Sequence, residues 1–275
     1  MSIICKTTFE TLRSLEKLFR ENRRASYSRF GDGDIFIMMG RSQKLHQFCL
    51  PLQMEMIEAF KIDHPHYTKG LAVNYRQEPG MVRGILGPHR VDHELQNFLL
   101  SRFDLATSTL FESAVFLHYL ALFYPSLANS FLNEYIRPKK KLFIGSVSQK
   151  QIEKLVGPVD YYVKTPERDS YAAIDRWWPE VMRHVEQVEL VIPATGMATR
   201  VVNKRLWNLG VTVQSFDIGS LVDAVELLPT RKWIRLAGHR AKRILLEPQQ
   251  KTLAAGFDYF QREVRLGCYS MIKKF

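Results

Sequence analysis

The sequence predicts an α/β protein in which a mostly parallel β-sheet is covered by helices on both faces. Two observations support this fold class. Short apolar runs alternate with helical patterns from about residue 140 onward, as expected when crossover helices join parallel strands. The chain also has 275 residues, 46% of them hydrophobic, so it can bury a core and is not a disordered chain.

The first half begins with an amphipathic helix. Thr7 and Glu10 have capping-box spacing, and apolar residues follow at helical intervals to about Asn22. The segment ASYSRF, residues 25–30, then alternates like a short strand. Helical patterns cover residues 50–62, 91–103, 110–124 and 126–136, residues 70–75 are typical of a strand, and residues 78–90 form a loop rich in Gly and Pro.

The second half alternates more regularly. Expected strands cover residues 140–146, 159–165, 188–194 and 211–219. Expected helices cover residues 149–156, 168–185 and 198–210. The second of these helices must accommodate Pro179, and Gly210 closes the third.

The net charge of +11 is concentrated at the C-terminal end. Residues 229–275 contain eleven Lys and Arg and three acidic residues. We therefore divide the chain into a main domain, residues 1–228, and a basic extension, residues 229–275, which is expected to be helical and packed on the domain. A basic segment suits nucleic acid, an acidic membrane surface or a phosphorylated substrate, and it is equally compatible with a solvated basic face.

Other features place the protein in the cytoplasm. No apolar run approaches the ~20 residues needed to cross a bilayer, and the N-terminus lacks the apolar stretch of a secretory signal. Cys5, Cys49 and Cys268 lie far apart and form no CxxC pair, which argues against a disulfide framework or a zinc site.

Polar segments follow five of the expected strands. Parallel strands present ligands at their carboxyl ends, so these segments are candidate binding positions. They are residues 31–34, 145–148, 164–169, 194–199 and 217–223.

Residues 194–199 have an anion-binding pattern. An apolar strand leads through Thr195 and Gly196 into a helix, whose free N–H groups and dipole would attract a phosphate. An ordinary strand-to-helix turn explains the same residues, and neither GxGxxG nor a P-loop is present. Ser146 and Lys164 follow two other expected strands, and each suits a contact with a phosphate. Ser146 is equally compatible with a helix N-cap, and Lys164 with a solvated charge.

Acidic residues suggest further chemistry. Asp32 and Asp34 have the DxD spacing through which a hard divalent cation, Mn²⁺ or Mg²⁺, can be held against a diphosphate. Gly31 and Gly33 flank Asp32 and permit the positive φ of a sharp acidic turn, and Arg29 can pair with the carboxylates or reach a phosphate. A tight turn without a metal remains the alternative.

Three stretches together resemble a known family, the bacterial GT-D-type glycosyltransferases, once classified only as a domain of unknown function. SRFGDGDIFIMMGRS resembles their R-[FY]-G-D-G-E motif, and KTPERDSYAAID resembles their segment before a long helix. VELVIPATGMATRVVNKRLWNLGVTVQSFDIGSL resembles a block containing LGPTAK and DIGH. The matches keep the family's order and extend from about residue 7 to 226.

The resemblance implies a Rossmann-like domain that transfers a sugar from a nucleotide sugar, typically a UDP-sugar, to a glycan acceptor with the help of a divalent metal. Asp34 would be the direct metal ligand, and Asp32 a second ligand or its support. Arg29, Gly31 and Gly33 would shape that site. Thr195 and Gly196 would lie in the phosphate turn, with Asp217 and Gly219 in the DIG segment. Candidates for a catalytic base are Asp217, Asp223 and Glu226.

The chain departs from the family pattern at three places. Asp34 replaces a glutamate, PATG replaces LGPT, and Ser220 replaces a histidine, so the role of that histidine does not carry over. An enzyme of this kind would act in the synthesis of a surface polysaccharide or a glycoprotein glycan, and an acceptor carried on a lipid diphosphate would bring the basic extension to the membrane. Two other hypotheses remain: a nucleic-acid-binding protein, disfavoured because no recognition motif is present, and a nucleotide-dependent hydrolase or phosphotransferase.

Overall fold

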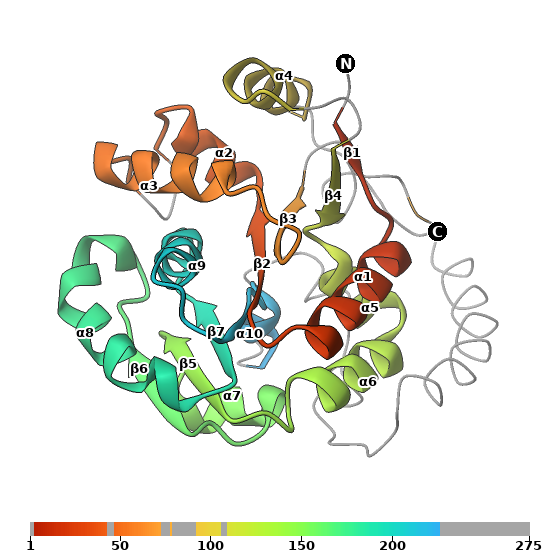
Figure 1. Cartoon of the computed structure of the whole chain (residues 1–275), viewed down its shortest axis with the longest axis vertical. Helices are drawn as coiled ribbons and strands as arrows, with labels where there is room; N and C mark the ends of the chain where they lie inside the picture. The colour runs from red at the N-terminus through yellow and green to blue at the C-terminus, as the bar shows by residue number, and fades with distance from the viewer. Residues whose placement is uncertain (1–2, 43–46, 73–77, 79–91, 106–108, 226–275) are drawn as a thin grey trace. The chain divides into compact units, whose positions relative to one another are not determined.

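The structure is a computed structural model, and it describes residues 3–42, 47–72, 78, 92–105 and 109–225 (Figure 1). The basic extension, residues 229–275, lies outside the described residues, as do Glu226 and most of the loop at residues 78–90. The predictions made for these segments stay predictions.

Eight strands form one sheet in the described part of the chain, in the order β1-β4-β3-β2-β8-β7-β5-β6. All neighbouring strands pair in parallel, which confirms the predicted fold class. The strands are β1 (Ile4–Cys5), β2 (Ala25–Phe30), β3 (Tyr67–Leu71), β4 (Leu110–Ser113), β5 (Lys141–Gly145), β6 (Tyr161–Lys164), β7 (Leu190–Ala194) and β8 (Gln214–Phe216).

Contact density divides the described chain into two compact units. The first contains the sheet and the helices α1 (Thr8–Glu21), α2 (Asp32–Met38), α3 (Leu50–Lys61), α4 (Asp92–Arg102), α8 (Ile174–His184) and α9 (Ala198–Asn208), with the 3₁₀ turns η1 (Ser170–Ala173) and η2 (Val185–Gln187). The second contains most of α5 (Phe116–Phe123), with α6 (Pro125–Tyr135), α7 (Gln149–Val156) and α10 (Leu221–Val225). Among the described helices, none has both the length and the apolar character that crossing a membrane requires.

Helices of the first unit cover both faces of the sheet. Phe19 of α1 packs edge-on against Phe216 of β8, with ring centroids 5.7 Å apart. The neighbouring residue, Ser215, donates a hydrogen bond of 2.5 Å to Asn203 of α9. Because successive residues of a strand point to opposite faces, α1 and α9 lie on opposite sides of β8. The predicted two-sided, Rossmann-like arrangement is confirmed.

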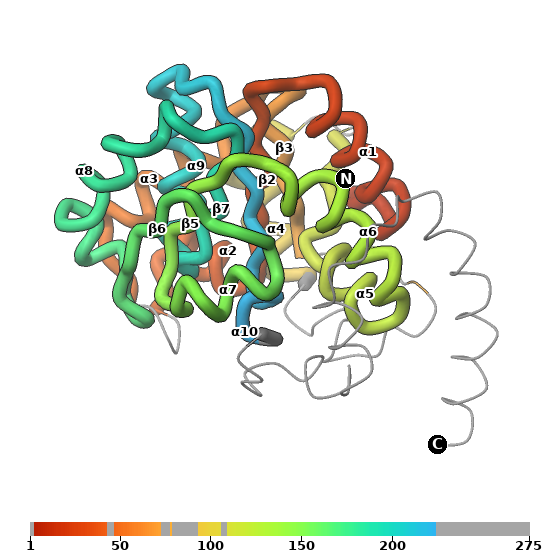
Figure 2. Tube along the Cα trace, turned by 90° about the horizontal axis from the view of Figure 1, so that it is seen from below, coloured from red at the N-terminus to blue at the C-terminus, as the bar shows by residue number. Residues whose placement is uncertain are grey.

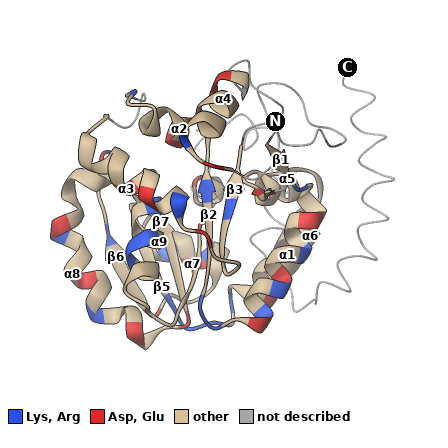
Figure 3. Ribbon diagram, turned by 45° about the horizontal axis from the view of Figure 1, so that its top comes forward, with Lys and Arg blue, Asp and Glu red and all other residues tan. Residues whose placement is uncertain are grey.

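Local sequence signals predicted two helix ends correctly. The Glu10 N–H donates to the Thr7 hydroxyl, and the Thr7 N–H donates to the Glu10 carboxylate, so the capping box at the start of α1 is present. Gly210 follows α9 with φ +71°, as expected of a helix-closing glycine. Acidic and basic positions alternate along the outer surfaces of α1 and α8 (Figure 3), while their apolar stripes are buried.

Two sequence predictions were wrong in detail, and one short strand was not predicted. Residues 110–124 do not form one helix, because Leu110–Ser113 is strand β4 and α5 begins only at Phe116. A four-residue apolar run cannot be assigned by periodicity alone, and here pairing with β3 decides it. The strand predicted at residues 70–75 is β3, which begins at Tyr67, and the two-residue edge strand β1 was not predicted.

The order of the strands brings the predicted ligand positions to one edge. β2, β8, β7, β5 and β6 are successive neighbours, and all run in the same direction. Figure 2 shows β6, β5, β7 and β2 in sequence across the molecule. The five polar segments of the sequence begin at or directly after the carboxyl ends of these five strands. Parallel pairing therefore gathers these segments along one edge of the sheet.

Candidate active site

The segment Gly31–Asp34 starts a helix and does not form an acidic turn. Gly31 is the N-cap of α2 with φ −80°, and Gly33 lies within the helix, so the expected positive φ is wrong at both glycines. Asp34 is the third helical residue, and its carboxylate accepts the Gly31 N–H at 2.8 Å. The motif is thus a helix start in which the second aspartate caps the backbone.

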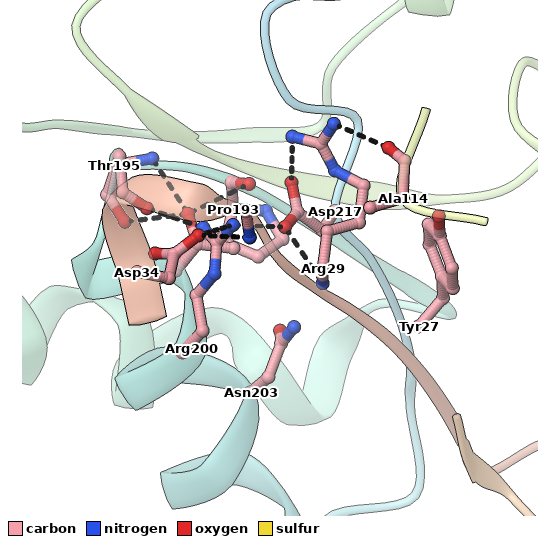
Figure 4. Close-up of polar contacts among 12 residues, drawn as sticks. Tyr27, Arg29, Asp34, Ala114, Pro193, Thr195, Arg200, Asn203 and Asp217 are labelled. Carbon is pink, nitrogen blue, oxygen red and sulfur yellow. Dashed lines mark hydrogen bonds and ion pairs between the residues drawn. The ribbon is translucent and has the colours of Figure 1, made fainter. Parts of the chain in front are cut away.

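Asp34 also pairs with an arginine of α9. Arg200 Nη2 lies 2.8 Å from Asp34 Oδ2, and both side chains are buried. The same Nη2 lies 3.5 Å from Asp217 Oδ2, directly after β8, while Arg200 Nη1 donates to the Gly196 carbonyl at 2.8 Å (Figure 4). Arg200 therefore joins the segments that follow β2, β7 and β8.

Arg29 completes the network from the other side of Asp217. Its Nη2 donates to Asp217 Oδ1 at 3.1 Å, and its backbone N–H donates to Oδ2 at 3.2 Å. Its Nη1 donates to the Ala114 carbonyl at 3.1 Å (Figure 4). The Asp217 N–H in turn donates to the Tyr27 carbonyl, so the backbone of Asp217 is hydrogen-bonded to β2. Asp34, Arg200, Asp217 and Arg29 form what we call the charge network.

Burial and charge act in opposite directions on the ionisation of this network. Burial raises the pKa of Asp34 to about 6, although the Arg200 charge and the Gly31 N–H lower it. Burial is the largest single influence on the pKa of Arg29 and lowers it, but the charges of Asp217, Tyr27 and Asp34 and the hydrogen bond to Asp217 together outweigh burial, so the net shift is upward. Arg29 therefore remains charged, and the charge of Asp34 depends on pH near neutrality.

Gly219 lies against the Arg29 guanidinium and has φ +59°. A methyl group there would overlap Arg29 Nη2, Cζ and Nη1. Gly219→Ala should therefore cost more than the ~1–2 kcal/mol of a left-handed L-residue, because Arg29 must also move. Gly210→Ala is the matched control, since its φ is +71° and a Cβ there meets nothing within 4 Å. Urea unfolding checks the difference, and equal losses in the two variants would contradict the close packing of Gly219 on Arg29.

The turn after β7 is built mainly from its own residues. The Thr195 N–H donates to the Thr199 hydroxyl at 3.1 Å, and the two hydroxyls lie 3.2 Å apart in a buried position. Gly196 is exposed with φ +62°, as a close approach to the backbone requires. The Thr195 hydroxyl is thus engaged within the turn. The phosphate contact of this segment stays a prediction, for which the backbone at Gly196 is exposed.

Three other predicted residues have contacts of their own. Lys164 Nζ donates to the Ser146 carbonyl, which joins the ends of β6 and β5. Asp223 belongs to α10 in the second compact unit, where its N–H donates to the Ser220 carbonyl. Of the predicted set, the structure brings together Arg29, Gly31, Asp34, Gly196, Asp217 and Gly219.

Comparison with known proteins identifies the fold. No protein-family profile matches the sequence, and no curated protein matches it. A solved structure from Streptococcus sanguinis, described as a new glycosyltransferase (DUF1792), is 17% identical and has a TM-score of 0.62 over 86% of each chain. A structure of selenomethionine-substituted domain of unknown function 1792 is 16% identical, with a TM-score of 0.59 over 86% of this chain and 83% of the other.

A third structure, in which that domain is described as a distinct glycosyltransferase fold, has a TM-score of 0.57 and 14% identity over 92% and 93% of the two chains. The chain has the DUF1792 fold. This shared fold agrees with the family resemblance of the three sequence stretches.

Arg200 belongs to the candidate site of this DUF1792 fold but was not predicted from the sequence. It contacts Asp34, Asp217 and Gly196, whereas no prediction named it. A signal was present: an arginine stands within the run ATRVV, of which every residue is buried in α9. A charged residue in such a run must find a partner, because an unpaired buried charge is costly.

The carboxylates fit a divalent cation only if a ligand supplies further oxygens. The described residues include no group of three or more His, Cys, Asp or Glu side chains that could hold a metal. Asp32 is exposed at the start of α2, with Oδ1 accepting the Gly33 N–H at 2.8 Å. Asp34 Oδ2 already accepts a hydrogen bond from the Gly31 N–H and pairs with Arg200 Nη2. A cation shared between Asp32 and a diphosphate suits this donor set, since Mg²⁺ and Mn²⁺ sites commonly use one or two carboxylates with substrate phosphates.

Proposed function

We propose that this protein is a glycosyltransferase that moves a sugar from a nucleotide sugar to a glycan acceptor at the carboxyl edge of β2, β8 and β7. The observation that carries the proposal is the position of Asp32, an exposed carboxylate at the start of α2 beside the buried charge network. The shared fold with a Streptococcus sanguinis protein described as a glycosyltransferase supports it.

In this proposal Asp32 is the cation ligand. Mn²⁺ or Mg²⁺, when bound, would neutralise the negative charge that develops on the leaving diphosphate. Asp34 was predicted as the direct ligand, but ligation through Oδ2 would require Arg200 to leave. We therefore assign Asp34 to holding the start of α2 against Arg200, so that the first turn presents Asp32.

Asp217 acts in this proposal as a positioning residue. Both of its carboxylate oxygens accept hydrogen bonds from Arg29, and Arg200 lies beside one of them. Its side chain is almost fully buried, so a substrate hydroxyl has little access to it. Of the three predicted bases, Asp223 and Glu226 remain candidates for proton abstraction.

The finer features of the proposal rest on the sequence. A UDP-sugar donor and an acceptor of the surface-polysaccharide or glycoprotein type follow from the family resemblance. We propose a cytoplasmic enzyme whose basic extension, residues 229–275, contacts an anionic membrane surface and thereby a lipid-linked acceptor. The excess of eleven basic over three acidic residues in that segment supports the contact.

A thermal-shift panel of nucleotides and nucleotide sugars, with and without Mn²⁺, tests the function. We expect one nucleotide sugar to raise the melting temperature only when Mn²⁺ is present. Asp32→Asn should abolish this cation-dependent rise and change the stability of the unliganded protein by no more than ~0.5 kcal/mol, because the side chain is exposed.

Asp175→Asn is the matched control, because Asp175 is also an exposed carboxylate in the first turn of a helix. Asp34→Ala is a poorer test, since it also removes the partner of Arg200. A cation-dependent rise that survives in Asp32→Asn would contradict the assignment of Asp32. No response to any nucleotide sugar would contradict the function itself, and hydrolysis of the nucleotide without an acceptor would favour a hydrolase.

A further inference from the structure

Five buried polar side chains lie together between α9 and the strands β2 and β3. They are Ser26, Ser28, Tyr67, Arg200 and Asn203, which we call the polar layer, and each is no more than 6% exposed. A helix packed on a sheet normally buries apolar side chains at such positions. The polar layer therefore needs a physical explanation.

The strand register brings the sheet side of the layer together. Ser26 is paired with Tyr67 of β3 on one side and with Ser215 of β8 on the other. Side chains of paired residues in parallel strands lie on the same face, and Ser28 shares that face because it is two residues beyond Ser26. Ser215 donates to Asn203, so this is the face that α9 covers.

The helix side of the layer is one stripe of α9. Arg200, Asn203 and Trp207 are spaced three and four residues apart, which places them on one side of the helix, and Figure 4 shows Arg200 and Asn203 projecting from the same stretch of α9. Trp207 packs against Tyr67 with ring centroids 5.4 Å apart. Burial raises the pKa of Tyr67, whereas a hydrogen-bonding approach of the Ser28 hydroxyl and the charge of Arg200 oppose the rise, so both residues lie near the phenol.

The layer has more hydrogen-bonding atoms than the protein satisfies. Within the described residues, the buried atoms Ser26 Oγ, Ser28 Oγ, Tyr67 Oη, Arg200 Nε and Asn203 Nδ2 have no hydrogen-bond partner of normal geometry. Leaving one such group unsatisfied costs roughly 1–3 kcal/mol. Even if Ser28 and Tyr67 pair with each other, the other three groups would together cost roughly 3–9 kcal/mol, an amount comparable with the ~5–15 kcal/mol by which a typical domain is stable, so a dry layer is disfavoured.

We propose that the polar layer binds a cluster of ordered water molecules that hydrogen-bonds Arg200 Nε and so fixes the guanidinium bridging Asp34 and Asp217. Water suits the site because it can accept from Arg200 Nε and Asn203 Nδ2 and also donate to the hydroxyls of Ser26, Ser28 and Tyr67. Buried waters of this kind typically make about three hydrogen bonds to groups that the protein leaves unpaired. The water cluster is thus part of the support of Arg200, through the Nε–H group that its carboxylate partners do not use.

The variant Tyr67→Phe tests the proposal, because the sign of its effect separates a wet layer from a dry one. In a wet layer the hydroxyl is hydrogen-bonded to water, so its removal should lower the melting temperature by about 2–4 °C, the equivalent of roughly one hydrogen bond in a protein of this size. In a dry layer the variant removes an unsatisfied buried group, and the melting temperature should rise.

Tyr27→Phe is the matched control. Tyr27 lies on the neighbouring strand β2, is equally buried, and donates directly to the Ser113 carbonyl at 2.8 Å. Its loss should lower the melting temperature by a similar ~2–4 °C whatever the state of the polar layer.

A crystal structure of the full chain then locates the cluster. We expect ordered water within hydrogen-bonding distance of Arg200 Nε and Tyr67 Oη, and at least one water fewer, with a displaced Arg200 guanidinium, in Tyr67→Phe. A rise in melting temperature for Tyr67→Phe, or side chains paired directly with no water between them, would overturn the proposal. A bromide soak in which the anomalous signal falls in the layer would also overturn it, because the occupant would then be an anion. None of these readouts requires a nucleotide sugar, so they stand independently of the proposed activity.

Discussion

Asp217→Ala is expected to lower the free energy of unfolding by about 3–5 kcal/mol, the range found when one partner of a buried ion pair is removed. Asp217 is the shared partner of two buried arginines, and it accepts both the Nη2 and the backbone N–H of Arg29. Its removal takes two hydrogen bonds from Arg29 and, among the described residues, leaves Arg200 with Asp34 as its counter-charge.

Urea unfolding at neutral pH measures this loss. Asp32→Ala provides the contrast: a carboxylate equally close to the edge of the sheet but exposed, whose removal should change the free energy of unfolding by no more than ~0.5 kcal/mol. Asp217→Asn should fall between the two, since it keeps a side-chain oxygen for the Arg29 N–H but loses the charge. A loss below ~1 kcal/mol in Asp217→Ala would mean that the two arginines find solvent when their partner is removed.

The fold was predictable because its determinants are local and repeated. Each parallel strand is a short apolar run, and each crossover helix has its own periodicity and end signals, as Thr7, Glu10 and Gly210 illustrate. The position of the candidate site was predictable for a geometric reason, because parallel strands necessarily place their carboxyl ends at one edge. Strand β4 was missed because its four residues become a strand only through pairing with β3.

The internal structure of the site was less predictable, because it depends on contacts between distant segments. From its sequence context alone, Asp34 is a suitable metal ligand. In the structure its carboxylate pairs with Arg200 of α9, which is far away along the chain. Likewise, the sequence makes Asp217 a candidate base, whereas in the structure both of its carboxylate oxygens accept hydrogen bonds from Arg29. Sequence spacing identifies groups with the right chemistry, whereas burial and cross-sheet pairing determine which of them remain accessible to a substrate.

Arg200→Met should reduce the free energy of unfolding by an amount that grows with pH. Methionine keeps much of the buried apolar stem but removes the charge that pairs with Asp34 and approaches Asp217. Asp34 has a pKa of about 6 in the folded protein, raised by burial above its ordinary value of 3.8, and Arg200 is the largest influence lowering it. Without Arg200 this pKa should rise further.

The sign follows from proton linkage. A carboxyl group with a raised folded pKa binds protons more tightly in the folded than in the unfolded state, so the stability it contributes is fully present below pH 3.8 and is lost as the pH rises through the folded pKa. In the wild type this loss is complete somewhat above pH 6, whereas in Arg200→Met it continues to higher pH because the pKa is higher. The difference between the two proteins should therefore be small near pH 5 and reach about 3–5 kcal/mol by pH 8, where Asp34 is a buried carboxylate without its partner.

Urea unfolding at a series of pH values, with EDTA present so that no cation binds the carboxylates, measures this difference. Adding Asp34→Asn to Arg200→Met supplies the control, because a neutral amide has no charge to bury. The double variant should regain stability at pH 8 and lose the extra pH dependence, and the coupling energy of the double-mutant cycle should be largest at the highest pH. A deficit in Arg200→Met that is the same at pH 5 and pH 8 would show that Arg200 stabilises the protein through packing and its bond to the Gly196 carbonyl, and not through the charge of Asp34.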